Sequence, residues 1–197
     1  MEQLSACIAD RMIDLNIISS DDRDIYCYSV QGLLEKTICL TLIIAVAALL
    51  HSLFEIIAFL SVFMLIRRSS DGIHCKTSVG CFCASTLMAL STIPLVHVIN
   101  IKSVILIGVI CAVIILCIIA TFNNPDLNLT KEELDHLKKR SRITSLITGG
   151  IVALLILLFP KNNLAPYLAL GVIYNAISIL IAILLGRRNR RDEKEKA

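Results

Sequence analysis

The stretch RRSSDGIHCKTSVGC, residues 67–81, organises the chain because it is a polar break in an otherwise apolar sequence. It places charged residues, a histidine and two cysteines between hydrophobic runs. Of the 197 residues, 56% are hydrophobic and only 18% are charged, whereas a soluble domain has about 25% charged residues. The composition therefore predicts an all-α fold, a polytopic membrane helical bundle that forms a single domain within the lipid bilayer.

The apolar runs on either side of this stretch predict about six transmembrane helices. Residues 37–66 contain neither proline nor glycine, and they exceed the roughly 20 residues that one crossing needs. His51, Ser52 and Glu55 interrupt the run, which favours a tight helical hairpin turning near residues 50–53 over the alternative of one long tilted helix. Four further apolar runs follow, at residues 79–99, 103–122, 143–159 and 165–185.

The remaining segments are polar and flank this bundle, which we expect over residues 22–186. Within residues 1–21, the pattern predicts an amphipathic helix that lies on the membrane surface or packs under the bundle. Thr130 and Glu133 form a capping box, which predicts a short charged helix running along the membrane surface to Arg142. Residues 187–197 form a basic tail, which we expect to be a disordered cytoplasmic anchor.

The basic residues predict an orientation for the bundle. With six spans and both termini on one side, all lysines and arginines except Lys102 and Lys161 fall in segments on that side. Cytoplasmic loops of membrane proteins carry an excess of such residues. We therefore expect a multi-pass protein of the bacterial cell membrane, with both termini and residues 67–81 on the cytoplasmic side.

His74 and Cys81 are the strongest candidates for catalysis, because a thiolate beside a histidine is the minimum equipment for a cysteine nucleophile. On a continuous helix their spacing of seven residues would separate them by about 10 Å. Cooperation therefore requires a loop before about residue 77, bent at Asp71 and Gly72, and a helix after it. Cys81 would then lie in the first helical turn, where the helix dipole lowers a thiol pKa. Cys75 and Cys83 are rival nucleophiles, and an interfacial histidine without catalytic function is the alternative for His74.

The eight cysteines do not predict a disulfide framework or a metal site. Several lie in apolar runs, where free cysteine behaves as a small hydrophobic residue, and the cytosol keeps thiols reduced. No second Cys/His pair completes a four-ligand zinc site. We expect no metal and no cofactor. A glycine-rich phosphate loop is also missing from the sequence, so we expect neither nucleotide nor nucleic-acid binding.

Over essentially its whole length, the chain resembles the accessory gene regulator protein B family of membrane peptidases, which mature bacterial quorum-sensing peptides. The family pattern is an arginine, a glycine turn, a histidine, a nearby lysine and a cysteine seven residues after the histidine. Here the matching residues are Arg67, Gly72, His74, Lys76 and Cys81. An upstream glutamate corresponds to Glu35, and a polar loop corresponds to Asn124 and Pro125 onward. Asp71 departs from the pattern, because the family commonly has a second glycine there.

This resemblance implies a catalytic dyad of His74 and Cys81. The implied enzyme is a cysteine endopeptidase that removes the C-terminal part of a precursor peptide and leaves the remainder as a thioester on Cys81. A thiol within the peptide then closes a thiolactone ring. The implied partner is the autoinducer precursor, with an amphipathic leader and an acidic C-terminal segment. The implied supporting residues are Glu35, Arg67, Arg68, Asp71, Gly72 and Lys76.

The supporting residues also have interpretations that do not involve catalysis. Glu35 either pairs with Lys36 or Arg67 at the membrane edge, or positions the substrate or His74, and the resemblance favours the second. Asp71 either caps a turn or orients His74. Positive-inside anchoring accounts for any of the basic residues, and we expect it to be the sole role of residues 138–142, whereas we expect Arg67 to contact substrate.

Two other classes of protein compete with the peptidase. A peptide exporter would place polar or small residues at mid-membrane, for which Gly149, Gly150 and Asn175 are candidates. A non-enzymatic membrane assembly factor would tolerate loss of Cys81 and His74. Small residues around Gly149 and Gly171 permit close helix packing, and we expect a homodimer, which they allow but do not require.

Overall fold

A computed structural model of the protein describes residues 2–15, 17–70, 78–99, 102–119, 131–159 and 162–195. In chain order, the elements are α1 (Glu2–Asp14), the 3-10 helix η1 (Ser20–Asp22), α2 (Arg23–Leu49), α3 (Leu53–Ser70), α4 (Ser78–Val98), α5 (Lys102–Ile119), α6 (Lys131–Leu158) and α7 (Ala165–Glu195). The described residues contain helices and no strand, which confirms the predicted all-α fold.

Four of these helices are long and apolar enough to cross a membrane. They span Ser20–Leu49, Lys102–Ile119, Asp135–Leu158 and Ala165–Leu184, and Cys83–Val98 is a shorter apolar helix. Many large apolar side chains on them face outward, among them Ile107 and Leu154, as expected for helices surrounded by lipid. A helical membrane bundle is therefore confirmed, while the count of six crossings stays a prediction.

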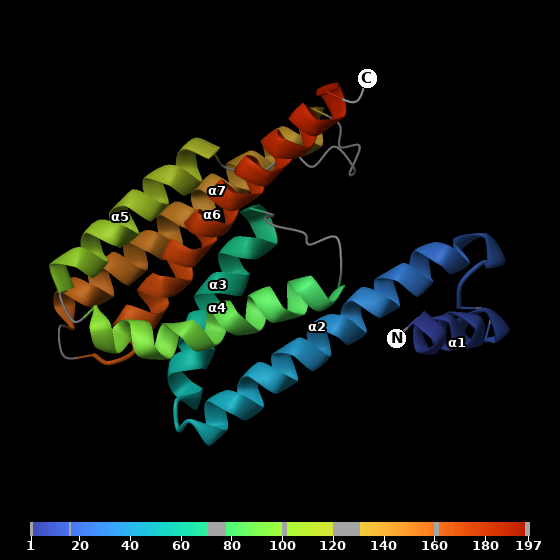
Figure 1. The fold of residues 1–197 in the computed structure, drawn as a ribbon, viewed down its shortest axis with the longest axis horizontal. Coiled ribbons are helices and arrows are strands. Elements are labelled where there is room, and N and C mark those ends of the chain that lie inside the picture. The colour runs from blue at the N-terminus through green and yellow to red at the C-terminus, as the bar shows by residue number, and fades with distance from the viewer. Residues whose placement is uncertain are drawn as a thin grey trace.

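The connections sort into two ends of the bundle (Figure 1). At one end, called the far end below, α2 ends and α3 begins, α4 ends and α5 begins, and α6 ends and α7 begins. The opposite end, called the junction end below, contains the last turn of α3, the first turns of α4 and α6, and the end of α5 (Figure 1). This arrangement places Arg67, Arg68 and residues 138–142 towards the same end, as the sequence predicted.

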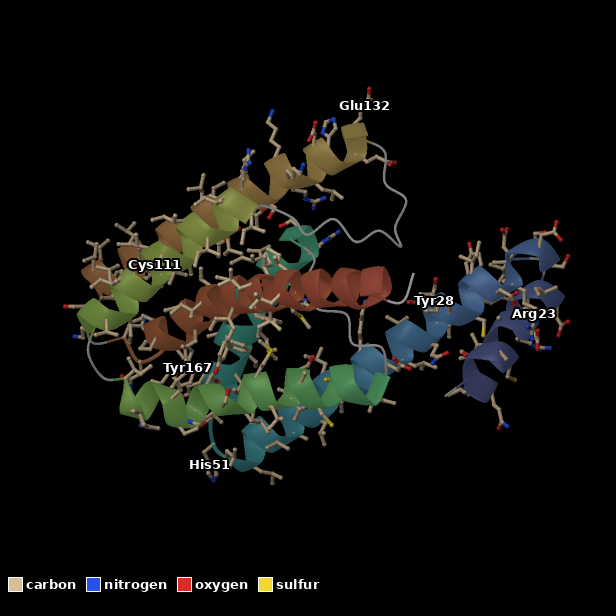
Figure 2. All side chains as sticks on the ribbon, turned by 45° about the horizontal axis from the view of Figure 1, so that its top comes forward. Arg23, Tyr28, His51, Cys111, Glu132 and Tyr167 are labelled. Carbon is tan, nitrogen blue, oxygen red and sulfur yellow. The ribbon has the colours of Figure 1, made fainter. Side chains whose placement is uncertain are left out.

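The predicted hairpin within residues 37–66 is confirmed. His51, at the tip of the turn (Figure 2), adopts a left-handed backbone with φ of 54°. Its N–H donates to the carbonyl of Ala48 at 3.1 Å, and the N–H of Ser52 donates to the carbonyl of Ala47 at 2.9 Å. These two bonds form a Schellman motif, which satisfies carbonyls left free at the end of α2. The polar interruption that the sequence shows there is thus a helix stop.

α3 and α7 form the centre of the bundle and take part in both hydrophobic clusters. One cluster joins them to α5 and α6 around Ile66 and Leu116, and the other joins them to α2 and α4 around Phe59 and Ala89. Gly171 allows α7 to approach α3 closely, because a Cβ there would lie 3.0 Å from the carbonyl oxygen of Phe59. The buried Asn175 side chain fixes the same contact by donating to the carbonyl of Phe63 at 3.1 Å.

Two predictions for the charged segments were wrong. The residues up to Arg142 do not form a separate surface helix, because α6 runs without interruption from Lys131 into the apolar segment that ends at Leu158. Its polar first turns, marked by Glu132 in Figure 2, and its apolar turns are one element. The basic tail was expected to be disordered, yet α7 continues through it to Glu195.

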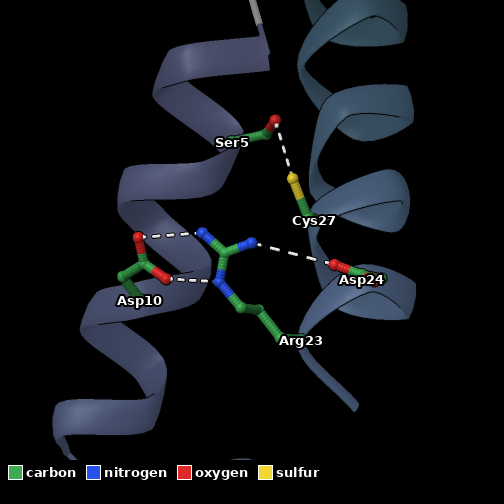
Figure 3. Close-up of polar contacts among 5 residues, drawn as sticks. All are labelled: Ser5, Asp10, Arg23, Asp24 and Cys27. Atoms are coloured by element: carbon green, nitrogen blue, oxygen red, sulfur yellow. Dashed lines mark hydrogen bonds and ion pairs between the residues drawn. The ribbon is translucent and has the colours of Figure 1, made fainter. Parts of the chain in front are cut away.

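α1 packs along the first turns of α2, beside the bundle rather than beneath it (Figure 1). Its buried residues are the small Ser5 and Ala9, whereas Leu4 remains 52% exposed. The face that packs is therefore the small-residue face, and part of the apolar face predicted from the pattern stays uncovered. Ser5 and Cys27 lie 3.4 Å apart, oxygen to sulfur (Figure 3).

An ion pair closes the α1–α2 contact. Arg23 donates from Nε to one oxygen of Asp10 at 2.6 Å and from Nη2 to the other at 3.1 Å (Figure 3). This two-pronged geometry suits a guanidinium and a carboxylate. The hydrogen bonds from Arg23 hold the pKa of the Asp10 carboxyl below its ordinary value of 3.8. α1 is thus tied to α2 by a contact that depends on an ionised Asp10.

Candidate functional site

The last residues of the predicted catalytic segment, residues 67–81, form the start of α4. This helix begins at Ser78, so Cys81 is its fourth residue and lies in the first turn. Helix after about residue 77 is what the dyad hypothesis requires, and the backbone of α4 confirms it. His74 lies outside the described residues, together with Asp71, Gly72 and Lys76.

The first turn of a helix favours an anionic sulfur. Its leading N–H groups have no partner within the helix, and the aligned peptide dipoles give that end a partial positive charge. Both effects lower the pKa of a thiol placed there and increase the fraction of thiolate. Cys83 lies two residues further along α4 with an exposed side chain, so it remains a rival nucleophile. Cys75 lies outside the described residues.

α2 is the helix that lies next to the start of α4. The first turns of α4 lie beside α2 in both views, and the two helices run in the same direction (Figures 1 and 2). Cys39 of α2 and Thr86 of α4 fix their register, with sulfur and hydroxyl oxygen 3.9 Å apart.

This register brings Glu35 level with Cys81. Glu35 precedes Cys39 by four residues, which is about 6 Å along a helix axis, and Cys81 precedes Thr86 by five, about 7.5 Å. The two residues therefore lie at nearly the same height on adjacent helices. The sequence alone suggested both residues but not this juxtaposition, because it depends on which helices pack together.

Gln31 holds the carboxylate of Glu35. It lies one turn earlier on α2, and its amide Nε2 donates to Glu35 Oε1 at 3.0 Å. Such a pair at positions i and i+4 stabilises a helix and restricts both side chains. Gln31 was not predicted as part of the site, although its spacing from Glu35 is the signal that would have found it.

Arg67, in the last turn of α3, is directed across to α7. Its Nη1 donates to the hydroxyl of Ser178 at 3.2 Å. Its guanidinium carbon lies 5.9 Å from the ring centroid of Phe63, within the range of a cation–π contact. Arg67 is half-buried, whereas its neighbour Arg68 is exposed. The two arginines thus differ in environment, and Arg67 is held in place by its surroundings.

Ser178 was not predicted from the sequence as part of the site. It is buried, and its hydroxyl also donates to the carbonyl of Asn175 one turn earlier on α7. A serine in an apolar helix has no distinctive pattern, and 111 positions separate it from Arg67. Only the packing of α3 against α7 reveals the pair.

The basic segment of α6 has a role beyond the predicted anchoring. Arg142 donates from Nε to the carbonyl oxygen of Cys117 at 3.0 Å. That carbonyl belongs to the last turn of α5, where helical carbonyls lack intrahelical partners and a cation is favoured. Lys138 lies 3.7 Å from Asp135 on the same helix. Arg142 therefore joins α6 to the end of α5.

Within the described part of the chain, no group of three or more His, Cys, Asp and Glu residues could hold a metal ion. Among the described residues, the candidate site therefore consists of a cysteine at the start of α4, a carboxylate at the same height on α2 and a restrained arginine on α3.

Comparison with curated proteins and with solved structures finds no match. The family model described as accessory gene regulator B, however, matches residues 5–183. The match extends from α1 to the last apolar turns of α7 and includes the whole of residues 67–81. The chain therefore belongs to the accessory gene regulator B family.

Proposed function

We propose that this protein is a membrane-embedded cysteine endopeptidase that processes an autoinducer precursor peptide, with Cys81 as nucleophile and His74 as general base. Membership of a family associated with autoinducer precursor processing supports the substrate class. The position of Cys81 in the first turn of α4 carries the assignment of the nucleophile, because a helix start favours the thiolate.

The reaction proceeds in two stages. His74 takes the proton of the Cys81 thiol, and the thiolate attacks the carbonyl carbon of the scissile peptide bond. The carbon–nitrogen bond then breaks, His74 returns the proton to the leaving amine, and the N-terminal fragment stays on Cys81 as a thioester. A cysteine thiol within that fragment next attacks the thioester carbonyl. A thiolactone forms, and the Cys81 thiol is regenerated with the proton from the attacking thiol.

The ring-closing step exchanges one thioester for another. Its main competitor is the attack of water on the thioester of the acyl-enzyme. Hydrolysis of the acyl-enzyme would release a linear peptide instead of a ring. The site lies where α4 enters an apolar bundle, next to α2, and such surroundings limit the access of water. The same surroundings favour intramolecular attack by a thiol that the bound peptide already carries.

The basic residues of the candidate segment suit the binding of an acidic peptide. We assign Arg67, Arg68 and Lys76 to the acidic C-terminal segment of the precursor, and Glu35 to positioning of the substrate or of His74. The proposal also requires a turn at Asp71 and Gly72 that returns His74 towards Cys81. Support for the role of Arg67 comes from its restraint by Ser178 and Phe63, since an arginine held in one position loses less freedom when it binds.

The orientation and assembly follow from the same proposal. The junction end faces the cytoplasm, where a newly made precursor is available, and its excess of basic residues agrees with the positive-inside rule. The protein acts as a homodimer. An exporter has less support, because Gly149 packs tightly against Val113 of α5 and Asn175 is bonded within the bundle.

Processing of a co-expressed precursor, read by mass, tests the proposed function. Wild type and a Cys83→Ser control should both release the C-terminal fragment, whereas Cys81→Ser and His74→Ala should release none. Cys83 is the matched control because it is an exposed cysteine on the same helix. Membrane insertion of each variant is verified by its amount in the membrane fraction.

Three outcomes would overturn parts of the assignment. If Cys81→Ser processes the precursor as well as wild type, Cys81 is not the nucleophile. If Cys83→Ser or Cys75→Ser abolishes processing and Cys81→Ser does not, one of those cysteines takes the role. Full processing by His74→Ala would remove His74 from the dyad.

A further inference from the structure

The far end of the bundle contains an apolar cavity that none of the proposed chemistry uses. It has a volume of about 150 Å³ and lies between α4, α5 and α7. Leu95 of α4, Ile99 just beyond the end of α4, Ile105 and Gly108 of α5, and Leu170 and Ile173 of α7 are among its lining residues. All of its lining residues are apolar, so it favours hydrocarbon over water.

The size of this cavity fits part of a lipid acyl chain. An engineered protein cavity of about 150 Å³ with a similar apolar lining stays dry and takes up benzene. A segment of roughly six carbons is therefore the matching occupant. Gly108 keeps this space open, since a Cβ there would lie 3.0 Å from Cδ1 of Ile173.

The cavity opens towards the lipid-facing surface of the bundle. Val104, one of its lining residues, is 50% exposed. The lining residues of α5 lie within the first two turns of that helix. The helix rises about 9 Å from Lys102, at its start, to Gly108, the last of these residues. An acyl chain can therefore enter from the side while its headgroup remains at the end of the helix, at the level of the membrane interface.

A second, smaller cavity at that level contains the one charged side chain found among the described residues that line the two cavities. It has a volume of about 30 Å³ and shares Ile105 and Pro166 with the first. Lys102 and Asn162 are its polar lining residues, and none of the acidic residues in the described ranges lines either cavity. A lysine ammonium beside an amide suits a phosphate, and an interfacial lysine can extend its charge into the headgroup region.

We propose that these two cavities together form a binding site for one anionic phospholipid. The phosphate lies at Lys102 and Asn162, and one acyl chain enters the apolar cavity between α4, α5 and α7. The site is separate from Cys81, which lies at the opposite end of α4. The inference rests on the membrane location of the bundle and is independent of the proposed peptidase activity.

Native mass spectrometry of the full chain tests this proposal. The protein is reconstituted in nanodiscs of phosphatidylglycerol and phosphatidylcholine in equal amounts, released into mild detergent and weighed with its retained lipids. Wild type should retain about one lipid, with phosphatidylglycerol preferred about fivefold, because one interfacial lysine contributes about that factor. Lys102→Gln should abolish the preference, and Lys102→Arg should keep it.

A second pair of variants separates this site from general lipid coating. Val104→Trp fills the mouth of the apolar cavity and should reduce retention of both lipids. Ile107→Trp is the matched control, because Ile107 is 60% exposed on the same helix and lines neither cavity. Its retention should equal that of wild type.

Three results would overturn the proposal. They are a wild type that retains no lipid, a Lys102→Gln variant that keeps the preference for phosphatidylglycerol, and a Val104→Trp variant that retains as much lipid as Ile107→Trp.

Discussion

At the scale of single residues, the restraint on Arg67 is the clearest feature of the candidate site. Its guanidinium is bonded to Ser178 and lies near the ring of Phe63. An exposed lysine or arginine near a membrane needs no such partner to act as an anchor. Arg67 is therefore better explained as a cation whose position matters, whereas the exposed Arg68 fits general attraction of an acidic peptide.

Ser178→Ala tests whether the position of Arg67 matters. Loss of a hydrogen bond of about 1 kcal/mol should raise the KM for the precursor about fivefold while the bundle still inserts. Ser61→Ala is the control, because the Ser61 hydroxyl bonds only within its own helix, to Ala58 at 2.8 Å. Steady-state processing in nanodiscs measures KM. An unchanged KM in Ser178→Ala would show that Arg67 needs no help from α7.

At the scale of elements, α5 and α6 approach each other tightly at Gly149. A Cβ at Gly149 would overlap Cγ2 of Val113, so only glycine allows this approach. The adjacent Gly150 is exposed, with nothing within 4 Å of the corresponding Cβ position. Two neighbouring glycines therefore have opposite roles, and only the packing distinguishes them. The buried one serves contact within the chain, which leaves Gly150 as the glycine available to a second copy.

Gly149→Ala should destabilise the bundle by about 1–3 kcal/mol, the usual effect of overpacking. Gly150→Ala should not, and it should stabilise α6 by up to about 1 kcal/mol because alanine is the better helix former. Thermal unfolding in detergent measures both. Restoration of stability in the double variant Gly149→Ala and Val113→Ala would identify the clash as the cause, whereas equal effects at the two glycines would contradict the packing.

The contact between α1 and α2 should depend on pH through Asp10. Because Arg23 lowers the pKa of Asp10 in the folded protein, the contact is fully stabilised above the ordinary value of 3.8 and weakens as pH falls through the lowered value. The distance between spin labels on α1 and the first turns of α2 should stay constant from about pH 8 to 5 and broaden only below the ordinary value.

Asp10→Ala should broaden that distance at every pH. Asp14→Ala is its control, because Asp14 pairs only within α1, 4.0 Å from Arg11, and it should behave as wild type. A wild-type distance that changes between about pH 8 and 5 would point to a different contact.

At the scale of the whole molecule, sequence reasoning succeeded where a local signal marks a boundary. The polar interruption at His51 marks the hairpin, and the polar stretch before Ser78 marks the start of α4. It failed where a change in polarity is not the end of a helix. α6 passes from charged to apolar turns without a break, and α7 continues into its basic end, since hydropathy locates the membrane boundary and not the last hydrogen bond.

Contacts between distant segments were also beyond the sequence. Arg67 with Ser178, Arg142 with the carbonyl of Cys117, and Glu35 at the height of Cys81 all depend on which helices are neighbours. The resemblance to a family identified the candidate residues; the family match confirms the family, and the roles of the residues stay predictions. The fold adds that the last turn of α3 and the first turns of α4 and α6 lie towards one end of the bundle (Figure 1).

The most direct test of the peptidase account is to trap the acyl-enzyme. The full-length protein in nanodiscs is given a precursor whose ring-forming cysteine is changed to alanine, so that the thioester cannot be passed on. The account predicts an increase in intact mass equal to the N-terminal fragment, located on Cys81, removed by hydroxylamine and absent in Cys81→Ala. An adduct on Cys75 or Cys83, or full processing with no adduct at all, would contradict it.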